Sequence, residues 1–159
     1  MLRNLIKKGQ KGFTIIEVMI VLAIAGLILV VVLVAVPQLQ RNQRNEARKS
    51  ILARINTEIA NYSGNNNGSI PTDQGDLDGV TSRYLSNIDI KDPSTDQNVV
   101  LTEGAPPASG SSTPTATQAV ASYLSGYICD GENIESSTAR SYAVWTLLEG
   151  GAIYCIDNL

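Results

Sequence analysis

The chain contains no histidine and only two cysteines, Cys129 and Cys155, among its 159 residues. Without histidine, a serine or cysteine nucleophile has no imidazole base, which argues against catalysis of the Ser-His or Cys-His type. A zinc shell of four cysteine or histidine ligands is also disfavoured, because two thiols fill only half of it. The sequence has no GxxxxGK[ST] phosphate-binding loop, so the chain cannot itself supply force driven by ATP. These absences favour a protein that is not an enzyme and needs no cofactor.

The charges are unevenly distributed along the sequence. The first 12 residues carry four basic groups and no acidic one, whereas the other 147 residues carry 8 basic and 15 acidic groups. Soon after the basic start, Val18 to Val36 is a run of 19 apolar or glycine residues. About 20 such residues in a helix cross a bilayer core of about 30 Å, so the run predicts a membrane-spanning helix.

A secretory signal peptide is one interpretation of a basic start before an apolar run. An ordinary signal has an apolar region of about 7 to 15 residues and ends at a small-x-small cleavage site. This run is longer, and Leu33 to Pro37 offers no such site. A simple anchor with its N-terminus inside is a better alternative, but basic residues beyond the helix compete with the leader under the positive-inside rule. These residues are Arg41, Arg44, Arg48 and Lys49.

The junction "KGFTIIE", Lys11 to Glu17, resembles the processing site of type IV prepilins and related prepilin-like proteins. It has a short basic leader ending in Gly12, an apolar Phe13, and a glutamate, Glu17, four residues after Phe13. The resemblance implies that a prepilin peptidase cuts between Gly12 and Phe13 at the cytoplasmic face of the membrane. It also implies that the new α-amine of Phe13 is methylated.

The carboxylate of Glu17 should be costly at the head of an apolar helix, and two features lower that cost. It lies in the first turn, near the positive end of the helix dipole. It also lies one turn from Phe13, whose α-amine becomes a free ammonium if the chain is cut before Phe13. In a dry bundle of such helices an unpaired carboxylate is so unfavourable that pairing with an ammonium is close to obligatory. The resemblance implies that this ammonium is the Phe13 amine of a neighbouring subunit, and that the pair sets the axial register of a filament. A simple helix-start acid, stabilised by the dipole and water, is the alternative.

Beyond Pro37 the pattern becomes amphipathic. Ile51, Ile55 and Ile59 recur every four residues, which predicts that the helix continues to about Tyr62, where "SGNNNG" is a stop signal. Pro37 should kink or loosen the helix, or mark its exit from the membrane, and it lies about one turn later than the proline of many pilins. The charged residues predicted to occupy the other faces are Arg44, Arg48, Arg54 and Glu58.

A basic cluster follows the apolar run and could form a nucleic-acid patch. No aromatic residue is interleaved to stack bases, and the rest of the chain is acidic, so DNA binding is disfavoured. Contacts with lipid headgroups in the precursor, or with acidic surfaces of adjacent subunits, are favoured instead. The cluster consists of Arg41, Arg44, Arg48, Lys49 and Arg54.

The segment Gly64 to Gln118 is predicted to be mostly irregular. Within it, "YLSNIDIKDPST" resembles the loop after the long helix of pilins and pseudopilins, where a short helix and a Lys-Asp-Pro turn are common. Val99 to Leu101 is a possible strand, and Thr102 to Gln118 has the composition of a flexible surface loop that could carry glycans. The acids of "TDQGDLDG" do not fit the spacing of an EF-hand, so they are predicted to be solvated turn acids.

The last 40 residues are predicted to form a sheet. The sequence "ARSYAVWTLLEGGAIYCIDN" predicts a hairpin with a Glu149-Gly150-Gly151 turn, since glycine supplies the positive φ that such turns need. Two cysteines in an exported domain fit one disulfide, Cys129 to Cys155. Closing that loop should add about 3 to 4 kcal/mol of stability in the chain-entropy model.

The predicted fold class is α+β, with a long N-terminal α-helical spine packed on a small C-terminal antiparallel β-sheet head. The spine has a membrane-spanning half and an amphipathic half. The predicted organisation is a cleaved basic leader (1–12), a hydrophobic transmembrane and filament-core helix (13–37), its amphipathic continuation (38–63), an irregular loop region (64–118) and a sheet head with a disulfide-bounded C-terminal region (119–159).

The resemblance implies a structural subunit of a type IV pilus, held in the cytoplasmic membrane as a single-pass precursor and polymerised into a surface filament of identical or related pilins. The implied partners are the membrane, a prepilin peptidase, a separate assembly ATPase and membrane platform proteins, with nucleic acid left open. Adhesion, twitching motility and DNA uptake are the uses open to such a filament. A pseudopilin of a type II secretion or competence system is the first alternative, and a single-pass anchored binding domain that never polymerises is the second.

Overall fold

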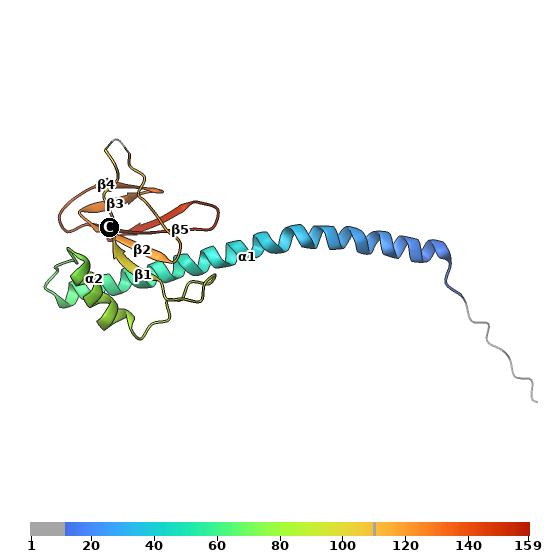
Figure 1. Ribbon diagram of the computed structural model, residues 1–159, viewed down its shortest axis with the longest axis horizontal. Helices are drawn as coiled ribbons and strands as arrows, with labels where there is room; N and C mark the ends of the chain where they lie inside the picture. Colours follow the sequence, from blue (N-terminus) through green and yellow to red (C-terminus); the bar gives the residue numbers. More distant parts are fainter. Residues whose placement is uncertain (1–11, 110) are drawn as a thin grey trace, which may run out of the picture. The chain divides into compact units, whose positions relative to one another are not determined.

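The computed structural model describes residues 12–109 and 111–159, which fall into two compact units, one ending at Gln40 and the other covering Arg41–Leu159. The leader, predicted at residues 1–12, therefore lies outside the described residues except for Gly12. Helix α1 (Ile15–Asn65) contributes to both units (Figure 1). The second unit also contains α2 (Gln74–Val80), a π-helical turn η1 (Thr81–Leu85), and strands β1 (Val100–Glu103), β2 (Val120–Ser125), β3 (Tyr127–Asp130), β4 (Asn133–Ser136), β5 (Tyr142–Leu147) and β6 (Ile153–Asp157).

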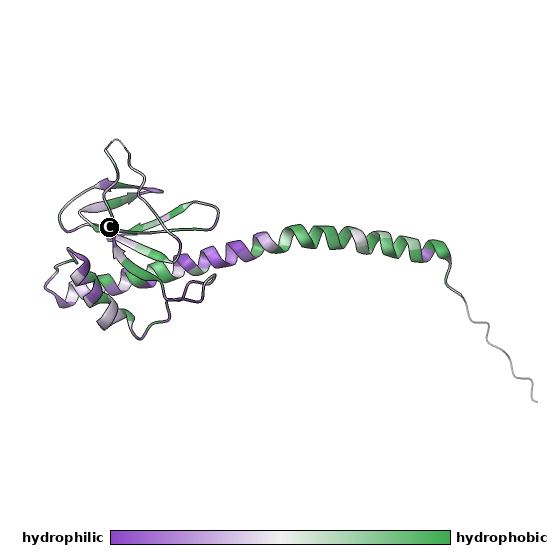
Figure 2. Ribbon diagram, viewed as in Figure 1, coloured by the Kyte–Doolittle hydropathy of each residue, from purple (hydrophilic) through white to green (hydrophobic). Residues whose placement is uncertain are grey.

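The described part of the first unit is the start of α1 and the residues before it. The helix begins directly after Thr14, whose Oγ1 accepts a hydrogen bond of 3.4 Å from the N–H of Glu17, as expected of an N-cap residue. Figure 2 shows an almost continuous hydrophobic colouring along this part of α1. The helix continues through Pro37, so the loss of one backbone donor does not end it.

In the second unit, α1 buries one stripe of side chains. Ile55 and Ile59 are fully buried, as the four-residue spacing predicts, and Leu52, three residues before Ile55, lies on the same stripe. Arg48 extends this stripe and is 3% exposed, so the prediction that it lies on another face is wrong. A buried ion pair, described below, holds its guanidinium in this position.

The end of α1 is set by backbone geometry at the predicted stop signal. Asn67 and Gly68 have φ angles of 55° and 79°, in the left-handed region that ends many helices. The N–H of Gly68 donates to the carbonyl of Ser63 at 2.8 Å and satisfies one of the last free carbonyls. The helix thus ends at Asn65, slightly later than the predicted end at about Tyr62.

The main sheet has four strands in the order β1-β2-β5-β6, and β3 and β4 form a separate antiparallel pair. The predicted hairpin is confirmed as β5 and β6, which are antiparallel and joined by a turn with positive φ at Gly150 and Gly151. β2 is antiparallel to β5, but β1 is parallel to β2. The sheet is therefore antiparallel except for the parallel pair of β1 and β2. The predicted antiparallel head did not include this parallel pair.

The two faces of the sheet carry two hydrophobic clusters. One face packs against α1 and α2, and its largest buried side chains from the central strands are Tyr123, Tyr142 and Val144. The other face carries a smaller cluster around Trp145 and Leu124. Successive strand residues point to opposite faces, so each central strand supplies both clusters.

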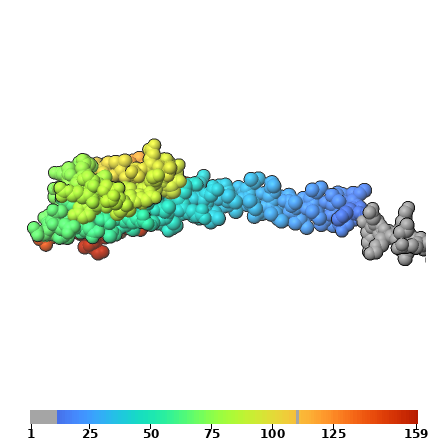
Figure 3. Space-filling model, turned by 90° about the horizontal axis from the view of Figure 1, so that it is seen from below, coloured from blue at the N-terminus to red at the C-terminus, as the bar shows by residue number. Residues whose placement is uncertain are grey.

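The segment 64–118 is more ordered than its composition predicts. It contains α2 and η1, and the possible strand at Val99 to Leu101 is β1, which starts one residue later. Figure 3 shows this segment, in yellow-green, lying against the second half of α1.

The residues between β1 and β2, predicted to be a flexible surface loop, cross the cluster around Trp145. The indole Nε1 of Trp145 donates to the carbonyl of Thr115 at 2.9 Å, and the N–H of Ile134 donates to the carbonyl of Ser112 at 2.9 Å. A parallel pair needs such a crossover connection, and here the connection also covers a core. The predicted α+β fold class is confirmed.

Candidate functional site

The start of α1 presents a long apolar surface. Every large apolar side chain from Phe13 to Leu39 is exposed, with exposed fractions between 42% at Val36 and 84% at Phe13. Patches of this size on soluble monomers are rare and usually mark contacts with membranes or other proteins. By length and composition, α1 is the one helix among the described residues that could cross a membrane, and its apolar window lies near the N-terminus.

The residues of the predicted processing junction lie at the tip of this surface. Gly12 and Phe13 are exposed and lie outside the helix, immediately before its cap. An extended, accessible peptide bond is what a peptidase requires, because helical backbone cannot enter an active-site cleft. The geometry is compatible with cleavage between Gly12 and Phe13, which stays a prediction, as does methylation of Phe13.

The carboxylate of Glu17 has a local partner. The hydroxyl of Thr14 donates to Glu17 Oε2 at 3.4 Å, while the N–H of Glu17 donates to the same hydroxyl oxygen. This arrangement is related to the capping box, in which a Thr or Ser at the cap and a Glu three residues later support each other. The Thr-x-x-Glu spacing could have revealed this role of Thr14 from the sequence. Because the contact is long and exposed, the carboxylate is still free to accept a stronger donor.

A second group of polar residues joins α1 to the rest of the second unit. Arg44 Nε and Nη2 donate to the two carboxylate oxygens of Glu149 at 2.6 and 2.7 Å, which is a bidentate pair. The same carboxylate accepts from Arg48 Nη1 at 3.1 Å and from the hydroxyl of Ser94 at 2.9 Å. Glu149 follows β5, so these bonds fasten the β5–β6 turn to the helix.

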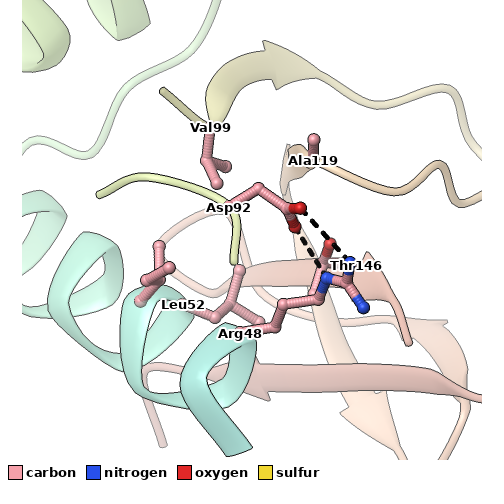
Figure 4. Close-up of a pocket in the computed structure, with 7 residues that line it drawn as sticks. Arg48, Leu52, Asp92, Val99, Ala119 and Thr146 are labelled. Atoms are coloured by element: carbon pink, nitrogen blue, oxygen red, sulfur yellow. Dashed lines mark hydrogen bonds and ion pairs between the residues drawn. The ribbon is translucent and has the colours of Figure 1, made fainter. Parts of the chain in front are cut away.

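Arg48 also forms the most deeply buried ion pair of the unit. Its Nε lies 2.7 Å from Asp92 Oδ2, and the two side chains are 3% and 1% exposed. Figure 4 shows the two groups facing each other beside Thr146 and Val99. A cavity of about 10 Å³ adjoins them, which is room for about one water molecule. Asp92 also accepts the backbone N–H groups of Ser94 and Thr95, at 2.9 and 3.2 Å.

These contacts shift the acidity of both carboxylates. The hydrogen bond from Arg44 is the largest cause that lowers the pKa of Glu149, to about 2. Burial alone would raise the pKa of Asp92, but the hydrogen bond from Arg48 and those from the backbone outweigh it, so the pKa lies below its ordinary value. Both groups are therefore ionised in the folded chain at neutral pH.

The residues of the basic cluster, predicted to meet lipid headgroups or other subunits, differ in whether their own chain binds them. Arg44 and Arg48 are bound to carboxylates of their own chain, which sequence reasoning missed because the partners lie 44 to 105 residues away. Lys49 pairs with Glu46 on the same helix at 2.8 Å, and Arg54 donates to a backbone carbonyl at 3.2 Å. Arg41 is exposed and remains available for an external contact.

The acids of the "TDQGDLDG" stretch serve the local structure. Asp73 caps α2 by accepting the N–H of Asp76 at 3.0 Å, and Asp76 accepts from the backbone of Thr72 and from the hydroxyl of Tyr62. No group of three or more metal-ligating side chains lies together in the part of the chain that the structure describes.

The two cysteines form a disulfide, Cys129 to Cys155, across 26 residues. It links β3 to β6 and so joins the two sheets. The N–H of Cys129 also donates to Asp157 Oδ2 at 2.9 Å, beside the disulfide.

Residues 7–33 match the family model described as the prokaryotic N-terminal methylation motif. This motif is the signature of type IV pilin and pseudopilin precursors, and the proteins that carry it are structural rather than catalytic. The match starts in the basic leader and ends within the apolar part of α1. No curated protein and no solved structure matches the chain.

Proposed function

We propose that this chain, which carries the N-terminal methylation motif of type IV pilin and pseudopilin precursors, is a structural subunit of a type IV pilus. It is made as a single-pass precursor in the cytoplasmic membrane, cut after Gly12 by a prepilin peptidase and methylated at Phe13. It then polymerises through the apolar part of α1 into a surface filament. The observation that carries this proposal is that the motif leads directly into a helix whose large apolar side chains, as far as Leu39, are all exposed.

The physical basis is the need to cover this apolar surface. Removing apolar surface from water is favourable by about 25 cal/mol per Å², so the exposed segment requires lipid or other helices around it. Lipid covers it in the precursor, and the same segment of neighbouring subunits covers it in the filament. A separate assembly ATPase and membrane platform proteins would drive the transfer between the two environments.

Glu17 restricts assembly to arrangements of subunits in which its carboxylate meets a cation. In the isolated chain the one contact of its carboxylate with the described residues is the long one with Thr14. In a helical bundle it would be buried, and a buried carboxylate needs a charged partner. The methylated amine of Phe13 on a neighbouring subunit is a cation at the correct end of the helix, so the pair would fix how far one subunit is displaced along its neighbour.

A pseudopilin of a type II secretion or competence system would carry the same motif and undergo the same processing. The disulfide between Cys129 and Cys155, which joins the two sheets of the head, suits either kind of subunit, because both expose the head to an oxidising compartment outside the cytoplasm. Electron microscopy of a deletion strain separates the two, because loss of long surface filaments supports a pilin. Intact surface filaments together with a secretion or DNA-uptake defect would support a pseudopilin instead.

Mass spectrometry of sheared surface filaments tests the processing and the assembly together. We expect a mature chain that begins at methylated Phe13. A second strain with Glu17→Gln should be processed but should form few or no filaments, whereas Glu46→Gln, an exposed glutamate on the same helix, should form them normally. A working protein that retains residues 1–12 would show that the chain is an anchored domain that does not polymerise. Normal filaments with Glu17→Gln would show that the proposed charge pair does not direct assembly.

A further inference from the structure

β1 is an edge strand of the four-stranded sheet, because β2 is its only neighbour among the described strands. The N–H groups of Val100 and Gly104 donate to carbonyls on the β2 side. Leu101 and Glu103 alternate with these residues, so their backbone groups point away from β2. Outward N–H and C=O groups of this kind can pair with a strand of another chain.

The side chain of Gln74, the first residue of α2, covers this edge. Its Oε1 accepts the N–H of Glu103 at 2.8 Å, and its Nε2 donates to the carbonyl of Leu101 at 3.3 Å. Nε2 also donates to Asp78 Oδ1 at 2.9 Å, one turn further along α2. The carboxamide therefore makes the pair of hydrogen bonds that a neighbouring strand would make, and Asp78 holds it in position.

The opposite edge of the sheet is covered in another way. β6 is linked to β3 by the disulfide and by the hydrogen bond from the N–H of Cys129 to Asp157. β1 has no covalent link of this kind, and Val100 beside the Gln74 contact is 56% exposed. At the accessible edge of the sheet, the outward hydrogen-bonding groups of β1 are thus covered by one uncharged side chain, that of Gln74.

We propose that Gln74 is an edge-masking residue, which occupies the outward hydrogen-bonding groups of β1 and prevents a second copy of this chain from adding a strand there. A second copy is the partner to exclude, since two identical edges can pair antiparallel about a twofold axis. The inference rests on the contacts of the head alone and holds whether or not the chain forms a pilus.

Amide hydrogen exchange of the full chain in detergent micelles tests the contact directly. In the wild-type chain the outward N–H of Glu103 should be protected. Gln74→Met, which keeps the length of the side chain but removes its hydrogen-bonding groups, should speed exchange of this amide by about 3- to 10-fold, the effect of one hydrogen bond. Gln118→Met, at an exposed glutamine in the loop before β2, should leave it unchanged.

Sedimentation of the same variants tests the consequence. Gln74→Met should self-associate more than the wild type and Gln118→Met, and adding Val100→Lys, a charge on the edge, should abolish the difference. Association common to all variants comes from the apolar helix and is subtracted. The proposal is overturned if Glu103 is unprotected in the wild type, which needs no variant to fold. It is equally overturned if Gln74→Met leaves exchange unchanged, or if Val100→Lys does not reverse the association.

Discussion

Replacing Arg48 with methionine should destabilise the second unit more than replacing any other charged residue of α1. Methionine retains much of the length of arginine but leaves the carboxylate of Asp92 without its guanidinium. The carboxylate is 1% exposed, so bulk water does not reach it to replace the lost partner. Its remaining donors are the backbone N–H groups of Ser94 and Thr95.

The size of the expected loss in the free energy of unfolding follows from the burial of Asp92. Removing one partner of a buried ion pair typically costs about 3 to 5 kcal/mol, because the other charge stays uncompensated. Arg48 also donates to Glu149, but that carboxylate keeps its bidentate bond with Arg44. We therefore expect a loss of about 3 to 5 kcal/mol at pH 7, a large part of the 5 to 15 kcal/mol that stabilises a typical domain. The loss should shrink as the pH falls, because without Arg48 burial raises the pKa of Asp92 and the carboxylate of the variant is protonated more readily.

Urea unfolding of the full chain in detergent micelles, followed by the fluorescence of Trp145, measures this loss. Trp145 is fully buried in β5, so its emission reports on the core. Arg41→Met is the matched control, since Arg41 is exposed on the same helix and its loss should change stability by less than about 0.5 kcal/mol. The double variant Arg48→Met, Asp92→Asn should lose about 1 to 3 kcal/mol less than the sum of the single changes. Equal stability of Arg48→Met and Arg41→Met would refute the argument.

Three further predictions concern the same unit. The pKa of Glu149, lowered from 4.5 to about 2, means that its contribution to stability is complete above about pH 4.5 and is lost as the pH falls toward 2; Glu149→Gln should flatten this part of a plot of urea midpoint against pH. Replacing both cysteines with serine should lower the free energy of unfolding by about 3 to 4 kcal/mol, and dithiothreitol should give the same loss in the wild type but none in the variant. A Cβ on Gly104 would lie 2.6 Å from Trp145 Cζ2, so Gly104→Ala should lower the free energy of unfolding by about 1 to 3 kcal/mol and shift the Trp145 emission. Gly79→Ala is the control, because a Cβ there meets nothing within 4 Å and should not destabilise the chain.

The features that could be predicted from the sequence depend on local patterns. The apolar run, the four-residue spacing of Ile51, Ile55 and Ile59, and the glycines of the β5–β6 turn each determine structure within a few residues of themselves. The predicted end of α1, at about Tyr62, is slightly early because the helix extends into the asparagines before Asn67 takes a positive φ. The disulfide could be predicted because the chain has only two cysteines.

The missed features depend on contacts between distant residues. Arginine on a helix is usually solvated, and only the folded chain brings Asp92 against Arg48. The parallel pairing of β1 and the covering of Trp145 by the Ser/Thr-rich connection likewise require the whole sheet to be in place. Composition predicts a loop correctly as non-helical, but it cannot indicate which carbonyl meets an indole N–H.

The division of the chain into two units leads to a last prediction. The polar links of the head, Arg44 to Glu149 and Arg48 to Asp92, lie within the unit that begins at Arg41, whereas Glu17 and the exposed apolar side chains lie in the unit that ends at Gln40. Glu17→Gln should therefore leave the urea midpoint of the head unchanged while it abolishes filaments. Arg48→Met should lower the midpoint while the precursor is still cut after Gly12 by prepilin peptidase in membranes. A gel shift on cleavage and the Trp145 unfolding curve, measured on both variants, test this separation. If Glu17→Gln destabilised the head as much as Arg48→Met, the carboxylate would be a structural group of the monomer, and its proposed role between subunits would be wrong.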